Sequence, residues 1–77
     1  MEHDETKVDE VVLALLFLNL FDDGGVTRAW KSIPWDSMDR LYEKGYISDP
    51  KSKSKSVIMT EEGEAAAEAM FTKLFVK

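Results

Sequence analysis

Apolar positions are densest near the start of the chain, in residues 11–21, where Asn19 is the single polar residue. They cannot all lie on one stripe of a helix, so a helix here must be covered on more than one side. Valine and phenylalanine make a strand the competing interpretation, but eleven residues without a turn signal favour a helix over residues 7–20. Thr6 is the expected N-cap, and the glycines at 24–25 are expected to close the helix end.

A second amphipathic segment follows at residues 34–44. Its apolar members fall at helical spacing and are expected to be buried: Trp35, Met38, Leu41 and Tyr42. Its polar members are expected to form the exposed face: Asp36, Ser37, Asp39, Arg40, Glu43 and Lys44. Pro34 suits a first helical turn, and Gly45 suits the position just after the last one. The preceding residues 26–33 are expected to add one short helical turn, at 28–31, which points Trp30 inward.

Strand and turn signals alternate in the next part of the chain. Residues 46–48 indicate a short strand, Asp49-Pro50 indicates a turn, and lysine alternates with serine over residues 51–56. A β-branched apolar strand follows, so a hairpin is predicted with strands near 46–48 and 56–59 and the lysines at its tip. Thr60 then caps a last helix with a clear amphipathic stripe. The stripe consists of Ala67, Met70, Phe71, Leu74 and Phe75.

The segment MDRLYEKGYISDPKSKSKSVIMTEEG, residues 38–63, resembles the helix-and-wing half of winged helix-turn-helix regulators of the multiple-antibiotic-resistance type. The matching features are Leu41, the turn glycine Gly45, a basic wing, and Thr60 before an acidic EG. The resemblance implies an α+β fold: a winged-helix-like three-helix core, one two-stranded hairpin (the wing) and an abbreviated second helix, in a single domain. Because only residues 26–33 are left for that second helix, the pattern argues against docking in a DNA groove.

Four stretches of the chain together resemble a small family of bacterial proteins that is described as a domain of unknown function. They are VDEVVLALLFL at 8–18, RAWK at 28–31, WDSMDRLYEKGYISDP at 35–50 and KSVIMTEEG at 55–63. The resemblance covers most of the chain. It implies a bacterial, cytoplasmic, winged-helix-like protein and does not imply an activity.

Composition narrows the classes of function. A chain of 77 residues forms at most one small domain, and the lack of cysteine excludes disulfides and cysteine nucleophiles and suits a reducing cytoplasm. The single histidine, His3, lies in an acidic terminus. Glu64 and Glu68 lack further oxygen ligands at regular spacing, which favours a solvated helix start over a cation site. We therefore expect no enzyme activity, no cofactor and no metal. The apolar run at residues 11–21 is about half the length that spans a membrane.

Charge is unevenly spread along this acidic chain, whose net charge is −5. Residues 24–56 hold seven basic and four acidic residues, a net charge of +3, whereas the segments on either side are acidic. The candidate contacts to nucleic acid in this middle segment are Arg28, Lys31, Ser37, Arg40, Lys51, Lys53 and Lys55. Any DNA binding is expected to be weak, non-specific and made through the wing.

Each of these candidates has an alternative explanation. The lysines also suit a solvated hairpin tip, which is the favoured interpretation. Arg40 is placed to form an i,i+4 pair with Asp36 that supports the helix. Trp30, between Arg28 and a lysine, either stacks on a base or belongs to the core, and the core is favoured.

The terminal helices carry more apolar surface than a chain of this size can cover by itself. Exposed apolar patches of several hundred Å² usually mark interfaces, so we predict a homodimer with the terminal helices paired about a two-fold axis. The expected interface residues are Leu15, Leu18, Phe21, Met70, Phe71, Leu74 and Phe75.

The favoured function is a non-enzymatic, dimeric protein-interaction module on a winged-helix-like scaffold. The alternative is a DNA-binding transcriptional regulator that contacts DNA through the lysine wing and the 35–44 helix. The acidic surface and the excess of apolar positions on the terminal helices favour the first. A titration against random duplex DNA at low and moderate salt separates the two.

Overall fold

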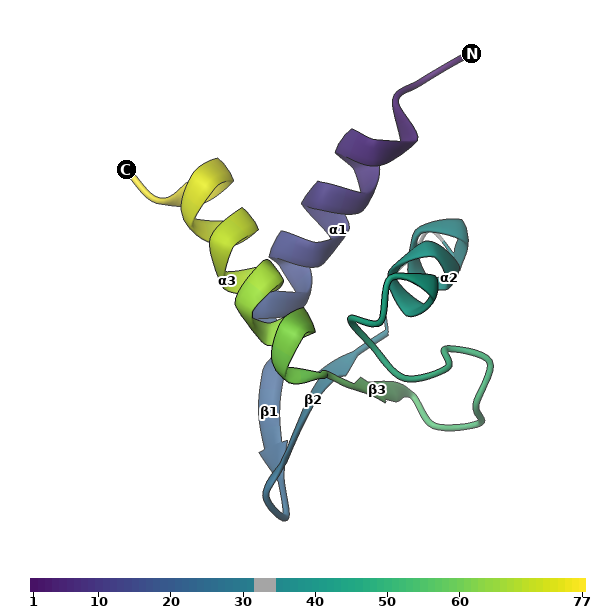
Figure 1. The fold of residues 1–77 in the computed structure, drawn as a ribbon, viewed down its shortest axis with the longest axis vertical. Helices are drawn as coiled ribbons and strands as arrows, with labels where there is room; N and C mark the ends of the chain where they lie inside the picture. Colours follow the sequence, from purple (N-terminus) through teal and green to yellow (C-terminus); the bar gives the residue numbers. More distant parts are fainter. Residues whose placement is uncertain (32–34) are drawn as a thin grey trace.

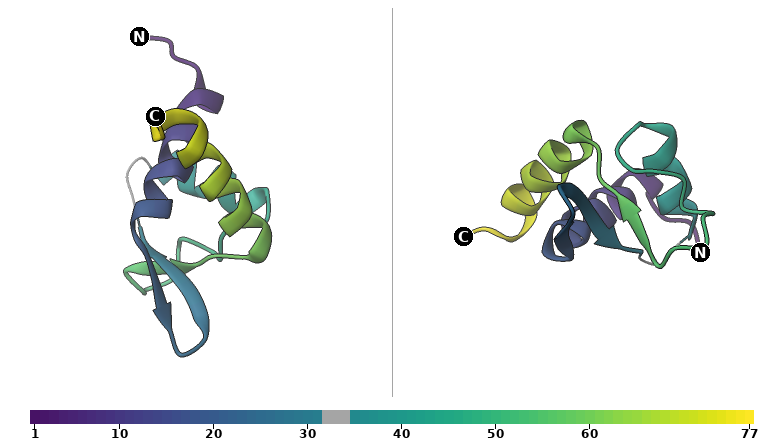
Figure 2. Two further views of the ribbon diagram at one scale, coloured as in Figure 1. Left: turned by 90° about the vertical axis from the view of Figure 1, so that its left-hand side faces the viewer. Right: turned by 90° about the horizontal axis from the view of Figure 1, so that it is seen from below.

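The computed structural model describes residues 1–31 and 35–77, which form a mixed α and β fold with three helices and a three-stranded antiparallel sheet (Figure 1). The elements are α1 (Glu5–Leu18), β1 (Leu20–Asp23), β2 (Val26–Trp30), α2 (Trp35–Glu43), β3 (Ser56–Ile58) and α3 (Glu61–Phe75). Helix α1 lies between α3 and α2, and the sheet extends from its C-terminal end (Figures 1 and 2). The predicted α+β class is confirmed at this level.

Helix α1 confirms the first predicted helix, with different ends. Its N-cap is Asp4, whose carboxylate accepts hydrogen bonds from the backbone N–H groups of Thr6 and Lys7, so the expectation that Thr6 is the cap was wrong. The helix ends at Leu18 because the next residues enter a strand. The helix buries residues on more than one side, as its apolar pattern requires: Asp9, Val12, Leu13, Ala14 and Leu16.

Strands β1 and β2 form a hairpin that the sequence analysis did not predict. Leu20 pairs with Ala29, and the register runs to Asp23 opposite Val26. Gly24 and Gly25 make the two-residue turn, both with positive φ (62° and 87°), which is the conformation that tight hairpins demand. The expectation that these glycines cap a helix was therefore wrong.

The predicted helical turn at 28–31 was also wrong, since β2 occupies most of it. Trp30 is 52% exposed rather than buried in the core, because strand alternation points Ala29 inward and Trp30 outward. Residues 32 and 33 of the predicted 26–33 segment, together with Pro34, lie outside the described residues.

Helix α2 confirms the second predicted helix but shows a different buried side. Ser37, Met38 and Leu41 are buried, whereas Trp35 and Tyr42 are 58% and 46% exposed. The buried face is thus rotated toward Ser37, which had been placed on the exposed face. A nine-residue helix has room for one narrow contact, and here that contact faces α1.

The predicted hairpin between residues 46–48 and 56–59 is reduced to a short contact. Ile47 and Met59 form an isolated bridge, and the Ser48 N–H donates to the Ile58 carbonyl at 2.9 Å. The principal partner of β3 is β2, with Ala29 opposite Val57. The lysine segment 51–55 is a loop, as expected, and it leads into β3.

The start of α3 is fixed by one close approach to the chain that follows α2. Thr60 confirms its predicted role as N-cap, since its hydroxyl oxygen accepts the Gly63 N–H at 2.9 Å and its O–H donates to the Gly45 carbonyl at 2.7 Å. A Cβ atom on Gly63 would overlap the carbonyl of Tyr46. Glycine at this position therefore sets how closely α3 and the turn at residues 45–46 can pack.

Replacing Gly63 with alanine is expected to lower the free energy of unfolding by about 1–3 kcal/mol, because the added methyl group meets backbone rather than a side chain that can move away. Urea unfolding followed by circular dichroism measures this change. The reference variant is Ala65→Gly, at an exposed position of the same helix, which reports helix propensity alone and should cost about 1 kcal/mol. A stabilised Gly63→Ala variant would contradict the close approach.

Candidate functional site

An apolar face runs along the outside of α1 and continues onto α3. Val11, Leu15 and Leu18 recur at helical spacing on α1, and they are 41%, 40% and 62% exposed. Leu74 and Phe75, at the end of α3, are exposed as well. A shallow hollow of about 390 Å³ joins the two helices, lined by Lys7, Glu10, Val11, Lys73 and Leu74. Val11 and Leu74 thus meet at this hollow. The exposed apolar residues Val11, Leu15, Leu18, Leu74 and Phe75 are called here the α1/α3 face.

The predicted interface residues do not all lie on one surface. Leu15, Leu18, Leu74 and Phe75 lie on the α1/α3 face. Phe71 is partly buried and its ring lies 5.0 Å from that of Phe17 and 5.6 Å from that of Phe75.

Met70 and Phe21 are the two members that lie elsewhere. Met70 is partly buried and packs against the core. Phe21 lies in β1, where its ring stacks on Trp30. Val11, which the prediction omitted, belongs to the face, and its i,i+4 spacing to Leu15 was the available signal.

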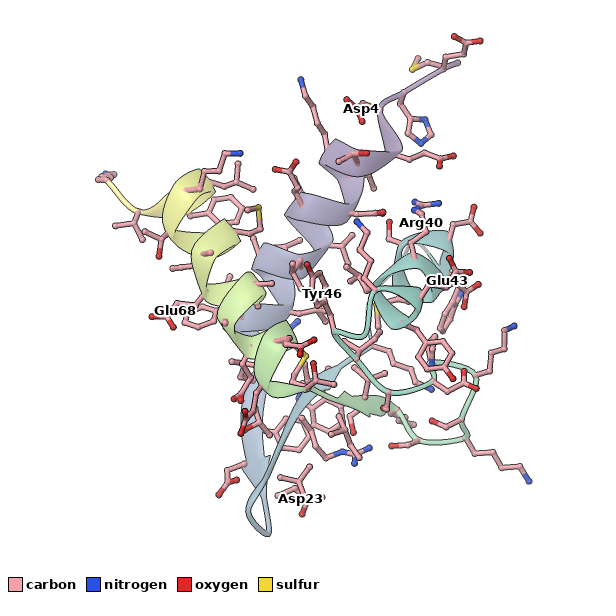
Figure 3. All side chains as sticks on the ribbon, in the orientation of Figure 1. Asp4, Asp23, Arg40, Glu43, Tyr46 and Glu68 are labelled. Carbon is pink, nitrogen blue, oxygen red and sulfur yellow. The ribbon has the colours of Figure 1, made fainter. Side chains whose placement is uncertain are left out.

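An ion pair between buried Asp9 and partly exposed Arg40 joins α1 to α2 on the other side of α1. Arg40 donates to both oxygens of Asp9, through Nε at 2.6 Å and Nη2 at 2.8 Å, and Nη2 also lies 3.4 Å from the Ser37 hydroxyl. Figure 3 shows Arg40 on α2 beside the N-terminal half of α1. The Arg40 guanidinium lowers the pKa of the Asp9 carboxyl; burial opposes this shift and Ser37 adds to it.

This pair accounts for two of the predicted nucleic-acid contacts. Ser37 is fully buried, and Arg40 is held by Asp9 and, at 3.4 Å, by Glu5. The expected i,i+4 pair between Asp36 and Arg40 is replaced by this contact between helices. Neither Ser37 nor Arg40 is presented to a ligand in this arrangement.

The other five predicted contacts gather around one end of the sheet. The Arg28 guanidinium donates to the hydroxyls of Ser54 and Ser56, and Lys31 Nζ donates to the Ser52 carbonyl at 2.7 Å. These bonds hold the lysine loop, residues 51–55, against β2. Lys51, Lys53 and Lys55 are exposed on that loop.

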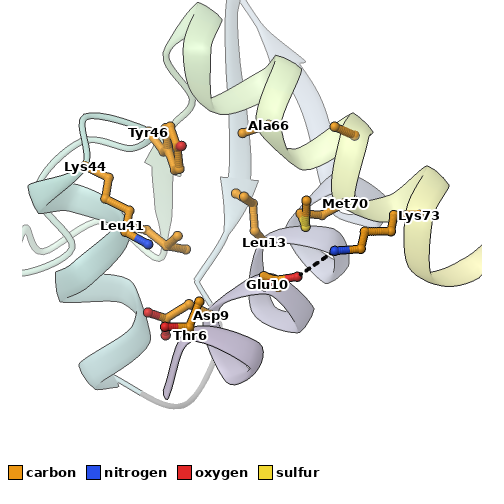
Figure 4. Close-up of a pocket in the computed structure, with 11 residues that line it drawn as sticks. Thr6, Asp9, Glu10, Leu13, Leu41, Lys44, Tyr46, Ala66, Met70 and Lys73 are labelled. Carbon is orange, nitrogen blue, oxygen red and sulfur yellow. Dashed lines mark ion pairs between the residues drawn. The ribbon is translucent and has the colours of Figure 1, made fainter. Parts of the chain in front are cut away.

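An open cavity of about 290 Å³ lies between α1, α3 and the C-terminal end of α2 (Figure 4). Leu13, Leu41 and Met70 contribute apolar surface, and Asp9, Glu10, Lys44 and Lys73 bring charge. Lys73 already pairs with Glu10 at 3.5 Å, and Asp9 pairs with Arg40. Most of the charged groups are thus already paired and hold the helices together. The cavity is therefore a weaker candidate for a binding site than the α1/α3 face or the surface formed by β2 and the lysine loop.

The described residues do not form a metal site or a membrane-spanning helix. Over the described residues, no group of three or more histidine, cysteine, aspartate or glutamate side chains is placed to hold a metal ion. None of the helices in the same ranges is long and apolar enough to cross a membrane.

Comparison with known proteins identifies a matching family and a similar protein. The sequence profile of a family described as a domain of unknown function, DUF6429, matches residues 4–77. A protein of Sinorhizobium fredii (strain NBRC 101917 / NGR234), described as the uncharacterized protein y4hR, is 47% identical over 77 residues, which is 100% of both chains. No solved structure matches the chain.

The Asp9–Arg40 pair predicts a specific acid dependence of stability. Because the folded-state pKa of Asp9 is lowered, its contribution is complete above the unfolded pKa of about 3.9 and is lost as the pH falls through the folded value. Asp9→Asn is expected to lower the free energy of unfolding at pH 7 by about 1–3 kcal/mol and to weaken the loss of stability below about pH 4.

Urea titrations at neutral and acidic pH measure both effects. Glu5→Gln is the matched control, since Glu5 reaches the same arginine from an exposed position and should change stability by less than about 1 kcal/mol. Equal effects of the two substitutions would contradict the role given to the Asp9–Arg40 pair.

Proposed function

The chain belongs to the DUF6429 family, a family of unknown function, and we propose that it acts as a non-enzymatic protein-interaction module that pairs with a second copy of itself. The observation that carries this proposal is the α1/α3 face. Three apolar side chains of α1 and two of α3 are at least 40% exposed, and Val11 and Leu74 line one hollow between the two helices. Contiguous apolar surface of this kind is typical of an interface.

The size of the chain supports the same conclusion. A domain of 77 residues buries little more than about 60% of its unfolded surface, so its core is small. Among the residues that the structure describes, the largest fully buried apolar side chains are Leu16, Met38, Leu41 and Val57. Covering the α1/α3 face with a second copy adds apolar burial that the single chain lacks.

Charge favours an antiparallel crossing of the two α1 helices. The first ten residues carry five acidic side chains, which would repel their symmetry mates if the helices ran in parallel. Crossing near Leu15 places each acidic start away from the other. Lys7, Glu10 and Lys73 lie at the rim of the face and bring both signs of charge to its edge.

A winged-helix regulator that reads a DNA groove is the less favoured function. Such a regulator needs an exposed recognition face on its second motif helix. On α2 that face would include Ser37 and Arg40, of which one is buried and the other is held by Asp9. The winged-helix likeness is supported by the order of α2, loop and β3, and the bacterial relative and the lack of cysteine support a bacterial, cytoplasmic protein.

Sedimentation velocity at high micromolar concentration is expected to give twice the 8.8 kDa chain mass for the unmodified protein. Leu15→Lys places a charge at the centre of the α1/α3 face and is expected to give a monomer with unchanged helix content. Lysine and leucine have similar helix propensities, so the substitution tests the interface rather than the helix.

The matched control is Val26→Lys. Val26 is 39% exposed, close to the 40% of Leu15, but it lies beside the hairpin turn and away from the α1/α3 face. This variant should remain dimeric. A stable monomer for the unmodified protein, or a dimer that survives Leu15→Lys, would rule the proposal out.

A further inference from the structure

The outer face of the three-stranded sheet differs from the α1/α3 face in chemistry. Strand alternation points Ala29 and Val57 into the core, where both are fully buried. The residues on either side of them in register point outward: Phe21 on β1, Arg28 and Trp30 on β2, and Ile58 on β3. The sheet therefore presents apolar, aromatic and cationic side chains together.

An aromatic pair lies at the centre of this outer face. The rings of Phe21 and Trp30 stack with centroids 4.7 Å apart and an interplanar angle of 26°. Trp30 nevertheless remains 52% exposed, and Ile58 is 39% exposed. Phe21 fixes the orientation of the indole while part of its surface stays open, which is the arrangement of a platform for a flat ligand.

Cationic side chains surround one end of the platform. Arg28 lies on the same face and is oriented by Ser54 and Ser56, with Nε donating to the Ser56 hydroxyl at 2.7 Å. Lys31 follows Trp30 directly and is anchored to Ser52. Through these bonds the strand and the lysine loop, residues 51–55, form one cationic border.

Two carboxylates lie at the margin of this border. Asp49 accepts the Lys51 N–H at 2.9 Å and so helps to shape the loop. Asp39 lines a hollow of about 440 Å³ together with Lys31, Trp35 and Lys51. Asp23, two residues from Phe21 on β1, adds a third carboxylate to the same outer face. Five cations therefore face three acids here, in a chain whose net charge is −5.

We propose that this outer face binds single-stranded nucleic acid, with a base stacked on Trp30 and the backbone phosphates along Arg28, Lys31 and the lysine loop. Stacking on exposed aromatics combined with a cationic track is the recognition mode of proteins that bind single strands with little sequence preference. A duplex keeps its bases stacked inside and cannot offer one to Trp30. The acidic remainder of the chain makes the interaction weak and strongly dependent on salt.

This surface and the α1/α3 face lie on different elements. The dimer contact uses α1 and α3, whereas the nucleic-acid contact uses the sheet and the loop that follows α2. The Leu15→Lys variant should therefore keep its nucleic-acid binding, and loss of either activity leaves the other measurable.

The test is fluorescence anisotropy of a labelled oligothymidylate of about 12 nucleotides at low and moderate salt, with the same sequence as a duplex for comparison. Trp30→Leu is expected to weaken single-strand binding about tenfold. Replacing Lys51, Lys53 and Lys55 with alanine is expected to reduce the salt slope by about two units, since each phosphate contact on a single strand contributes about 0.7.

Tyr42→Ala is the matched control, because Tyr42 is an aromatic residue with 46% exposure that lies on α2 outside the sheet. It should leave the affinity unchanged, and circular dichroism establishes that each variant is folded. Quenching of tryptophan fluorescence by the oligonucleotide, lost in Trp30→Leu while Trp35 is retained, would support stacking directly.

Four results would overturn the proposal. They are the absence of binding at low salt, binding that is indifferent to Trp30→Leu, a duplex bound as tightly as the single strand, and binding to vesicles of anionic lipid in place of the oligonucleotide. The last would assign the aromatic and cationic surface to a membrane surface instead.

Discussion

Asp9 places a carboxylate on the buried side of the central helix, and a charge there is tolerated only with a partner at close range. Arg40 is that partner, and its two hydrogen bonds fix how α2 is rotated against α1. With this rotation Ser37, Met38 and Leu41 enter the core and Trp35 and Tyr42 remain outside. The ion pair thus determines what the surface of α2 offers, and it removes the arginine that a groove-reading helix would need.

The close packing of α3 depends on a second, purely steric condition. Gly63 lies against the Tyr46 carbonyl, and Thr60 hydrogen-bonds across the same junction. Because α3 starts at this point, its direction along α1 is set there, and with it the alignment of Leu74 beside Val11. Packing in the core therefore determines how the two helices that carry the α1/α3 face lie against each other.

Much of the fold could be predicted from local sequence signals. Except for the choice of Thr6 over Asp4 as the first N-cap, which is a local error, the failures depend on contacts between distant parts of the chain. The three helices and the Thr60 cap depend on periodicity and on short-range hydrogen bonds, which a single sequence displays. The Asp22-Asp23-Gly24-Gly25 segment suits both a helix end and a tight hairpin, and the pairing of β2 with the distant β3 favours the hairpin. The buried side of α2 likewise depends on Asp9, 31 residues away from Arg40.

The candidate surfaces were predicted in part for the same reason. An excess of apolar positions in α1 is visible in the sequence, so four of the seven expected interface residues lie on the α1/α3 face. The grouping of Arg28 and Lys31 with the lysine loop depends on strand β2, where the sequence pattern predicts a helical turn. The Phe21–Trp30 stack requires the register of the hairpin, which no local pattern contains.

The pairing of β2 with β3 also bears on the order in which the molecule folds. Helix α1 and the β1–β2 hairpin use only contacts that are close in sequence, so they can form as soon as residues 5–30 are available. One edge of β2 and one side of α1 then stay uncovered. They are covered only by β3 and α3, which lie at the other end of the chain. During synthesis on the ribosome, this half-built unit exposes an open strand edge and an apolar helix, and it is the species most exposed to misassembly.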